Sequence, residues 1–164
     1  MLDQNLAAGV VVIDDQHAHA LEVVDRLQAL IHGIGPEDTE LAHEFDELWW
    51  EIGPVLSGRR LLAHNAAFDM RVLGALVRTR DLAAPDYEYA CTVSLARKAL
   101  PELHNHKLDT VCDHCGIRLV HHDAASDAEA CARVALACVH ASGASSIGEA
   151  TRSLGVGTRQ LQCR

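Results

Sequence analysis

The sequence lacks any long hydrophobic run. Its longest apolar stretch is about seven residues, from Ala7 to Ile13, whereas a membrane-spanning helix needs about 20. We therefore expect no membrane-spanning segment and no membrane partner. The N-terminus also lacks the basic start and apolar core of a secretory signal, so we expect a cytoplasmic protein whose six cysteines are free thiols.

The sequence also lacks an excess of basic charge. It has 14 Lys and Arg against 23 Asp and Glu, a net charge of −9. General electrostatic attraction to nucleic acid is therefore not favoured, and any polyanion must be bound locally, for example through metal ions. What is present is a chain of 164 residues that is 49% hydrophobic, enough for one domain with a real core.

The order of predicted elements indicates a mixed α/β fold with helices on both faces of a sheet. Residues 9–13, 61–63 and 87–92 are predicted strands. Residues 20–31 are ambiguous, because several of their apolar positions fit a helix, and we assign them to a second strand. Helices are predicted over 45–52, where Gly53-Pro54 interrupts or kinks the helix, over 67–80, from Thr92 to before Pro101, over 107–115 and over 124–140. A short helix starting at Ser146 is followed by a tail in which Gly155-Val156-Gly157 ends the pattern.

Asp69 is the first candidate for chemistry. It falls in the first turn of the predicted helix that follows the short strand 61–63. The positive end of the helix favours its ionised form, which suits a cation ligand. The alternative is that Asp69 only complements the helix dipole, and that Asn65 is only the N-cap.

Asp127 is the second candidate. It lies four, seven and eleven residues before Cys131, Val134 and Cys138, on the apolar side of one helix. A buried carboxylate needs a compensating group, either a metal ion or an Arg or backbone partner. His122 must come from the loop before this helix, where Asp123 can serve as the N-cap.

Cys112 and Cys115 allow a zinc-binding interpretation. The competing interpretation is stronger, because Leu108, Val111, Cys112 and Cys115 follow helical spacing and predict buried thiols on an apolar face. Trp49 and Trp50 are similarly predicted to be the core and rim of one helix instead of a platform for stacking bases.

Three segments in a fixed order carry a family resemblance. They are Ile31-His32-Gly33-Ile34 followed by Pro36-Glu37-Asp38, then His64-Asn65-Ala66-Ala67-Phe68-Asp69, then the pair His122-x4-Asp127. Two further matches are Cys91-Thr92-Val93-Ser94-Leu95-Ala96-Arg97 and Lys107-Leu108-Asp109-Thr110. Together they resemble the DEDDh, or DnaQ-like, 3′–5′ exonucleases, and most closely the proofreading epsilon subunits of bacterial DNA polymerase III.

The resemblance implies a ribonuclease H-like fold and hydrolysis of the terminal phosphodiester at a 3′ end by two divalent cations, Mg²⁺ or Mn²⁺. It makes Asp69 and Asp127 the metal ligands and His122 the residue that takes the proton of the attacking water. Asn65 and Phe68 would contact the substrate. The expected partner is a nucleic-acid 3′ end, with DNA favoured over RNA, and a DNA polymerase is a further candidate partner.

The sequence departs from the family at its first motif. We find no Asp-x-Glu pair ahead of His32, because Asp3, Asp14 and Asp15 are each followed at the second position by an amide or a histidine. The sheet is therefore expected to lack its first strand, in an exonuclease-like domain (1–142) that is truncated or degenerate, followed by a short helix and tail (143–164). Activity is expected to be low unless one of these Asp residues completes the site. The alternative is a non-catalytic module that binds nucleic acid or a polymerase.

Overall fold

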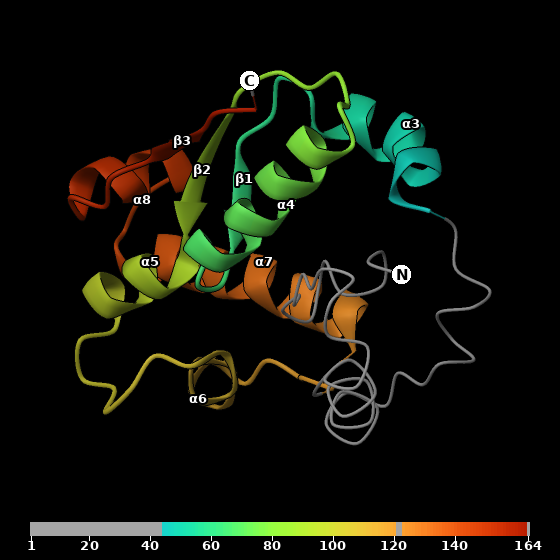
Figure 1. The fold of residues 1–164 in the computed structure, drawn as a ribbon. Coiled ribbons are helices and arrows are strands. Elements are labelled where there is room, and N and C mark those ends of the chain that lie inside the picture. The colour runs from blue at the N-terminus through green and yellow to red at the C-terminus, as the bar shows by residue number, and fades with distance from the viewer. Residues whose placement is uncertain (1–43, 121–122, 164) are drawn as a thin grey trace.

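The computed structural model describes residues 44–120 and 123–163. Within these ranges a three-stranded sheet is accompanied by six helices (Figure 1). In chain order the elements are α3 (Phe45–Leu56), β1 (Leu61–Ala63), α4 (Ala67–Thr79), β2 (Tyr87–Cys91), α5 (Thr92–Ala99), α6 (Leu108–Cys115), α7 (Ala124–Ala141), α8 (Ile147–Ser153) and β3 (Arg159–Leu161). The strands predicted over 9–13 and 20–31 lie outside the described residues.

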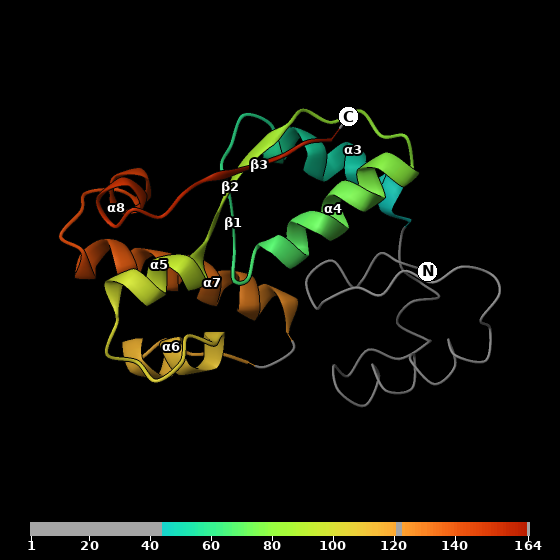
Figure 2. The ribbon, with the colours of Figure 1, turned by 60° about the vertical axis from the view of Figure 1, so that its left-hand side comes forward.

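The sheet is mixed, as predicted. β2 lies in the centre, parallel to β1 and antiparallel to β3. Leu61 is opposite Tyr89, and Tyr87 is opposite Leu161. Both views show α4 alongside the strands, with α5, α7 and α6 stacked below the end at which β1 and β2 finish (Figures 1 and 2). The carboxyl ends of two parallel strands therefore meet at the edge nearest these helices.

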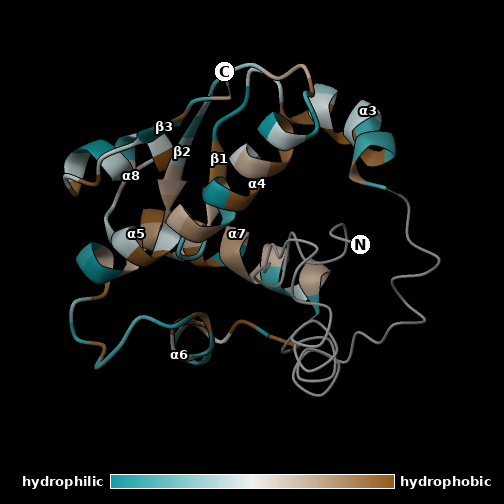
Figure 3. Cartoon of the chain, viewed as in Figure 1, coloured by the Kyte–Doolittle hydropathy of each residue, from teal (hydrophilic) through white to brown (hydrophobic). Residues whose placement is uncertain are grey.

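Two clusters of buried side chains hold the fold together. The first comes from α3, α4, β2 and β3, and the second from α5, α6, α7 and α8. Hydrophobic residues gather where β1, α5 and α7 come together (Figure 3). Within the second cluster Val111, Val134 and Cys138 are fully buried, as the helical spacing of the apolar residues predicts.

The predicted tail is in fact part of the sheet. Leu161 of β3 packs on Gly74 of α4 so closely that a Cβ atom at Gly74 would lie 2.8 Å from the Leu161 Cδ1 atom. Arg78 donates a 3.2 Å hydrogen bond to the Gln162 carbonyl, and the Cys163 N–H donates to the Asp86 carboxylate at 3.1 Å. The sequence prediction missed β3 because three residues after a glycine-rich turn are too short to show a strand period.

Helix α3 does not end at Gly53-Pro54, so the predicted interruption is wrong, while the alternative of a kink stays a prediction. The helix continues to Leu56 with Pro54 inside it. A proline removes one helical hydrogen bond, but Pro54 is exposed and lies in the last turn. The next turn is closed by the Ser57 N–H, which donates to the Gly53 carbonyl at 3.1 Å.

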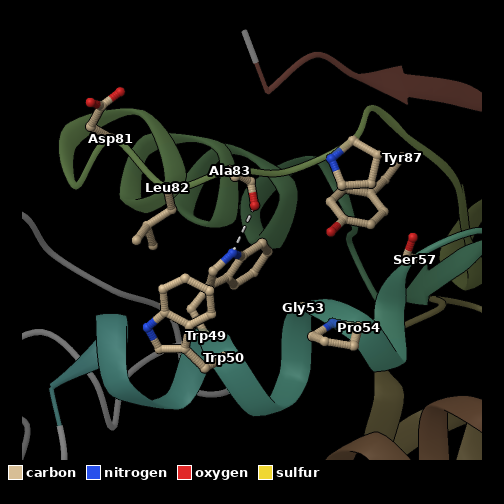
Figure 4. A pocket seen from close by; sticks show the side chains of 10 residues that line it. Trp49, Trp50, Gly53, Pro54, Ser57, Asp81, Leu82, Ala83 and Tyr87 are labelled. Atoms are coloured by element: carbon tan, nitrogen blue, oxygen red, sulfur yellow. Dashed lines mark hydrogen bonds between the residues drawn. The ribbon is translucent and has the colours of Figure 1, made fainter.

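The two tryptophans take the core and rim positions that were predicted. Trp49 is buried and its indole N–H donates to the Ala83 carbonyl at 3.0 Å, whereas Trp50 is 80% exposed. Figure 4 shows both rings at a pocket of about 430 Å³ between α3 and the loop before β2. Tyr87 also lines this pocket, and its buried hydroxyl has no hydrogen-bond partner among the described residues.

The remaining predictions for cysteines and helix ends are confirmed. All six cysteines are free; Cys112, Cys131 and Cys138 are buried, and Cys115 is half-buried. The Ser146 hydroxyl accepts a 3.2 Å hydrogen bond from the Glu149 N–H at the start of α8. In the part of the chain that the structure describes, no helix is long and apolar enough to cross a membrane.

Candidate exonuclease site

The turn between β1 and α4 carries the first group of predicted site residues. Asn65 has a φ of +71°, a left-handed conformation that asparagine tolerates better than most residues. Its carbonyl accepts a 3.0 Å hydrogen bond from the Phe68 N–H. The N-cap of α4 is Ala66, without a side-chain hydrogen bond, so the alternative interpretation of Asn65 as an N-cap is wrong. Asn65 instead reverses the chain so that α4 starts directly beside the end of β1.

Phe68 and Asp69 form the first turn of α4. Phe68 is half-buried, and the Arg71 guanidinium lies 5.8 Å from the centre of its ring. Asp69 is half-buried too, and burial raises the pKa of its carboxyl above the usual range, although its own backbone N–H opposes this. No ion pair joins Asp69 to a basic residue within 44–120 or 123–163. A half-buried carboxylate without a basic partner is the donor chemistry that a divalent cation fits.

Asp127 lies in the first turn of α7, on the side that the sequence predicted. Cys131, Val134 and Cys138, which share this side, are all buried. The Asp123 carboxylate caps the helix by accepting a 2.7 Å hydrogen bond from the Ser126 N–H, which confirms its predicted role. Asp127 is half-buried. The predicted His122 lies outside the described residues.

An electrostatic link places Asp69 near the start of α7. Burial is the main reason that the pKa of Cys131 is raised, and the charge of Asp69 adds to this effect. Cys131 lies one turn along α7 from Asp127, and α7 contacts β1. The charge of Asp69, which follows β1 closely, therefore acts on the residue one turn after Asp127. That Asp69 and Asp127 bind the same pair of metal ions stays a prediction.

A partly buried hydrogen-bond network lies at the edge where β1 and β2 end. The His64 Nδ1 atom is 2.9 Å from the Thr92 hydroxyl, and its Nε2 atom is 3.0 Å from the His106 carbonyl. Because a carbonyl only accepts, Nε2 carries the proton and the Thr92 hydroxyl donates to Nδ1. The same hydroxyl lies 3.5 Å from the Cys131 sulfur. The network thus joins the end of β1, the start of α5, the loop before α6 and helix α7.

Neither His64 nor Thr92 is among the predicted site residues. A signal was available, since each follows one of two neighbouring predicted strands and the ends of parallel strands meet at one edge. Burial lowers the pKa of His64, while its hydrogen bond to the His106 carbonyl and the charge of Asp109 oppose the change. His64 is therefore suited to positioning the edge as a neutral side chain.

The described residues alone do not complete a metal centre. Among them, no group of three or more His, Cys, Asp or Glu side chains is placed to hold an ion. Asp69 and Asp127 have suitable chemistry for the carboxylate part of such a centre. Further donors would have to come from segments such as 1–43 and 121–122.

Comparison with known proteins decides the family. A model of the exonuclease family matches residues 16–135, more than half of the chain. This chain belongs to the exonuclease family. It is a DnaQ-like 3′–5′ exonuclease-like domain with a ribonuclease H-like fold. Exonucleases of this kind use divalent metal ions.

The exonuclease domain is similar to part of much longer polymerases. It is 46% identical over 71 residues to the PolC-type DNA polymerase III of Oceanobacillus iheyensis, and this match covers 43% of this chain and 5% of that protein. It is 30% identical over 123 residues to the PolC-type DNA polymerase III of Bacillus cereus, and this match covers 66% of this chain and 9% of that protein. The chain therefore spans less than a tenth of the length of these relatives.

A solved structure shares the fold. Exonuclease X, in complex with 5′ overhanging duplex DNA, superposes with a TM-score of 0.59 over 79% of this chain and 73% of that one. The two sequences are 20% identical. The expected architecture is confirmed by this similarity.

Proposed function

We propose that the exonuclease domain removes nucleotides from the 3′ end of nucleic acid, with DNA preferred over RNA. Asp69 and Asp127 are the proposed ligands of two divalent cations, Mg²⁺ or Mn²⁺. The observation that carries this proposal is the half-buried Asp69 carboxylate, which has a raised pKa and no ion pair to a basic residue in the described ranges. Asp69 lies close to the edge of the sheet where β1 and β2 end.

Each residue has a separate role in the proposed reaction. When bound, the divalent cations would activate water and stabilise charge on the attacked phosphate and the leaving oxygen. Asp69 and Asp127 would supply negative charge from the first turns of α4 and α7. His122, five residues before Asp127, would accept the proton of the attacking water, for which an imidazole pKa is well matched. Asn65 and Phe68 would contact the terminal nucleotide beside Asp69.

The proposed setting is the cytoplasm, alongside or within a DNA polymerase. The similarity to PolC-type DNA polymerase III supports this setting, since a proofreading nuclease acts on the strand that its polymerase extends. Exonuclease X in complex with DNA supports a nucleic-acid substrate for the shared fold.

A second candidate function is binding without hydrolysis. It is favoured by the absence of an Asp-x-Glu pair ahead of His32 and by the lack of a three-donor cluster within the described ranges. Two carboxylates attract two divalent cations less strongly than four. In this case the domain would hold a nucleic-acid end or a polymerase through the same fold.

One experiment separates the two candidates. The 164-residue chain is incubated with Mn²⁺ and single-stranded DNA labelled at its 5′ end, and the products are sized over time. Shortening from the 3′ end that Asp127→Asn abolishes, and that His122→Ala reduces by about 100-fold, supports hydrolysis. Asp113→Asn, which changes an exposed carboxylate on α6, is the matched control and should leave the rate unchanged.

Two outcomes oppose the hydrolytic proposal. DNA that is bound but not shortened supports the second candidate. Shortening that survives Asp127→Asn shows that the assigned ligands are wrong. If the wild-type chain is active, Asn substitutions at Asp3, Asp14 and Asp15 identify which residue completes the ligand set.

A further inference from the structure

A groove lined by basic residues adjoins the candidate site. It has a volume of about 460 Å³ and lies between the turn after β1, the first two turns of α5 and the loop from α8 to β3. We call it the basic groove. The residues that line it include Cys91, Arg97, Lys98 and Arg159.

The charge of the basic groove is unlike that of the whole chain. The groove has three exposed cations, Arg97, Lys98 and Arg159, and no Asp or Glu among its lining residues. Within the described ranges none of the three forms an ion pair, whereas Arg60 pairs with Glu88 at 2.9 Å. In a protein of net charge −9, these three cations remain available to an external anion.

The position of the basic groove connects it to the site. Its lining includes Asn65 and Ala67, and Ala67 is two residues before Asp69 on the first turn of α4. A polyanion lying in the groove therefore ends beside the residues that the proposed function assigns to the terminal nucleotide. Three cations can neutralise about three phosphates of a strand.

We propose that the basic groove binds the sugar–phosphate backbone of the nucleic-acid strand whose 3′ end enters the candidate site. The proposal rests on the proposed function for the direction of the strand, but its binding chemistry does not require hydrolysis. Cations that contact phosphates fix the position of a strand without reading its sequence. The groove thus supplies a local attraction for phosphate that the net charge of −9 does not favour in general.

Cys91 provides a built-in reporter of the groove. Burial opposes ionisation of its thiol, but hydrogen bonds from the backbone N–H groups of Ser94 and Ala66, together with the Ser94 hydroxyl, lower its pKa below the ordinary value. Burial instead raises the pKa of Cys112 and Cys138, each to about 11. Cys91 should therefore be the most readily alkylated thiol in the described part of the chain.

The first test measures binding of a fluorescent 12-nucleotide single-stranded DNA in EDTA, over a range of NaCl concentrations. Arg97→Ala and Arg159→Ala should each raise the Kd by about 3- to 10-fold and lower the slope of log Kd against log salt by about 0.7. Arg59→Ala is the matched control, because Arg59 is exposed and lies outside the groove. The Kd of an RNA of the same sequence shows whether the groove discriminates between deoxyribose and ribose.

The second test adds a negative charge to the groove instead of removing a positive one. A Cβ atom at Gly157 would meet no atom within 4 Å, so a longer side chain there enters open space in the groove. Gly157→Glu should weaken DNA binding, while the neutral Gly157→Gln of similar size should weaken it far less. If Arg97→Ala, Arg159→Ala and Gly157→Glu all bind like the wild type, the proposal is overturned.

The third test uses Cys91 as the reporter. Bound 12-nucleotide DNA should slow alkylation of Cys91 several-fold, and the mononucleotide dTMP at equal phosphate concentration should not. Unchanged alkylation in saturating DNA would contradict the proposal, as would equal protection by dTMP, because neither fits a strand lying along the groove.

The two proposals can fail separately. Salt-dependent binding through the groove without hydrolysis in Mn²⁺ overturns the catalytic assignment and leaves the groove intact. Hydrolysis that depends on Asp127 but is insensitive to every groove variant overturns the groove and leaves the catalytic assignment intact.

Discussion

The His64 imidazole accepts a hydrogen bond from the Thr92 hydroxyl across a Nδ1–Oγ1 distance of 2.9 Å. His64 follows β1 and Thr92 follows β2, so this contact ties together the ends of two parallel strands. The other imidazole nitrogen holds the loop before α6 through the His106 carbonyl. The relative position of three elements around the candidate site thus depends on one neutral histidine.

Removing the Thr92 hydroxyl should destabilise the domain. Thr92 is fully buried, and Thr92→Val keeps its shape while leaving the His64 Nδ1 atom without a donor. We expect the free energy of unfolding to fall by about 1 to 3 kcal/mol, measured by urea denaturation. The control is Thr79→Val, because the exposed Thr79 hydroxyl donates within its own helix, to the Ala75 and Leu76 carbonyls. This substitution should change stability by less than about 0.5 kcal/mol. Equal effects of the two substitutions would show that the network does not stabilise the edge.

Acidification should weaken the fold through His64. Because burial lowers the pKa of the folded imidazole below 6.5, the unfolded chain takes up a proton first as the pH falls, and stability falls with it. His64→Gln should therefore lose less stability than the wild type between pH 7 and pH 5, as followed by the melting temperature. His104→Gln, at an exposed histidine, should follow the wild-type profile. A wild-type profile for His64→Gln would contradict this assignment.

Asp69 should destabilise the domain when no cation is bound. Its pKa is raised by burial, so above that pKa the folded state holds an ionised carboxylate less favourably than the unfolded chain does. Asp69→Asn should raise the melting temperature in EDTA at neutral pH by about 1 to 3 °C. Mn²⁺ should then stabilise the wild type but not the variant. A lower melting temperature for Asp69→Asn in EDTA would mean that the carboxylate has a structural partner.

The unpartnered Tyr87 hydroxyl should also destabilise the fold. Tyr87 is 1% exposed, and its oxygen has no hydrogen-bond partner among the described residues. Tyr87→Phe removes a buried polar atom and keeps the ring, so thermal unfolding should show unchanged or greater stability, by up to about 1 kcal/mol. Tyr89→Phe, at a half-buried ring, is the control for the loss of a phenol. A loss of more than about 1 kcal/mol in Tyr87→Phe alone would reveal a hydrogen bond from outside the described residues.

Much of the described fold follows from local patterns. The boundaries of β1, α4, β2, α5, α6 and α7 agree with prediction to within about two residues, because apolar periodicity, proline and capping residues act over a few positions. β3 was missed because its formation depends on pairing with β2 from far along the chain. The predicted interruption at Pro54 does not occur, because Pro54 stands in the last turn of α3, where a proline removes one helical hydrogen bond without ending the helix.

The candidate site was predictable only where a motif reported it. Asp69, Asn65 and Asp127 stand in segments with a family pattern, and their helix positions follow from spacing. The basic groove is only partly covered by such a segment, Cys91 to Arg97. Arg97 and Lys98 are adjacent in sequence, but Arg159 joins them only because β3 pairs with β2 and brings the loop after α8 beside α5. Long-range pairing of this kind leaves no local signal.

The central strand imposes an order on assembly. β2 meets β1 through a short crossover made by α4, but it meets β3 only after α5, α6, α7 and α8 have been traversed. A long loop must close before this second pairing forms. The entropic cost of closing it is smaller if the intervening helices have already packed together. The second hydrophobic cluster draws on these four helices and Val156, so it can form from one continuous segment. The first cluster includes Leu161 and Cys163, so this cluster and the basic groove are both complete only once β3 has paired with β2.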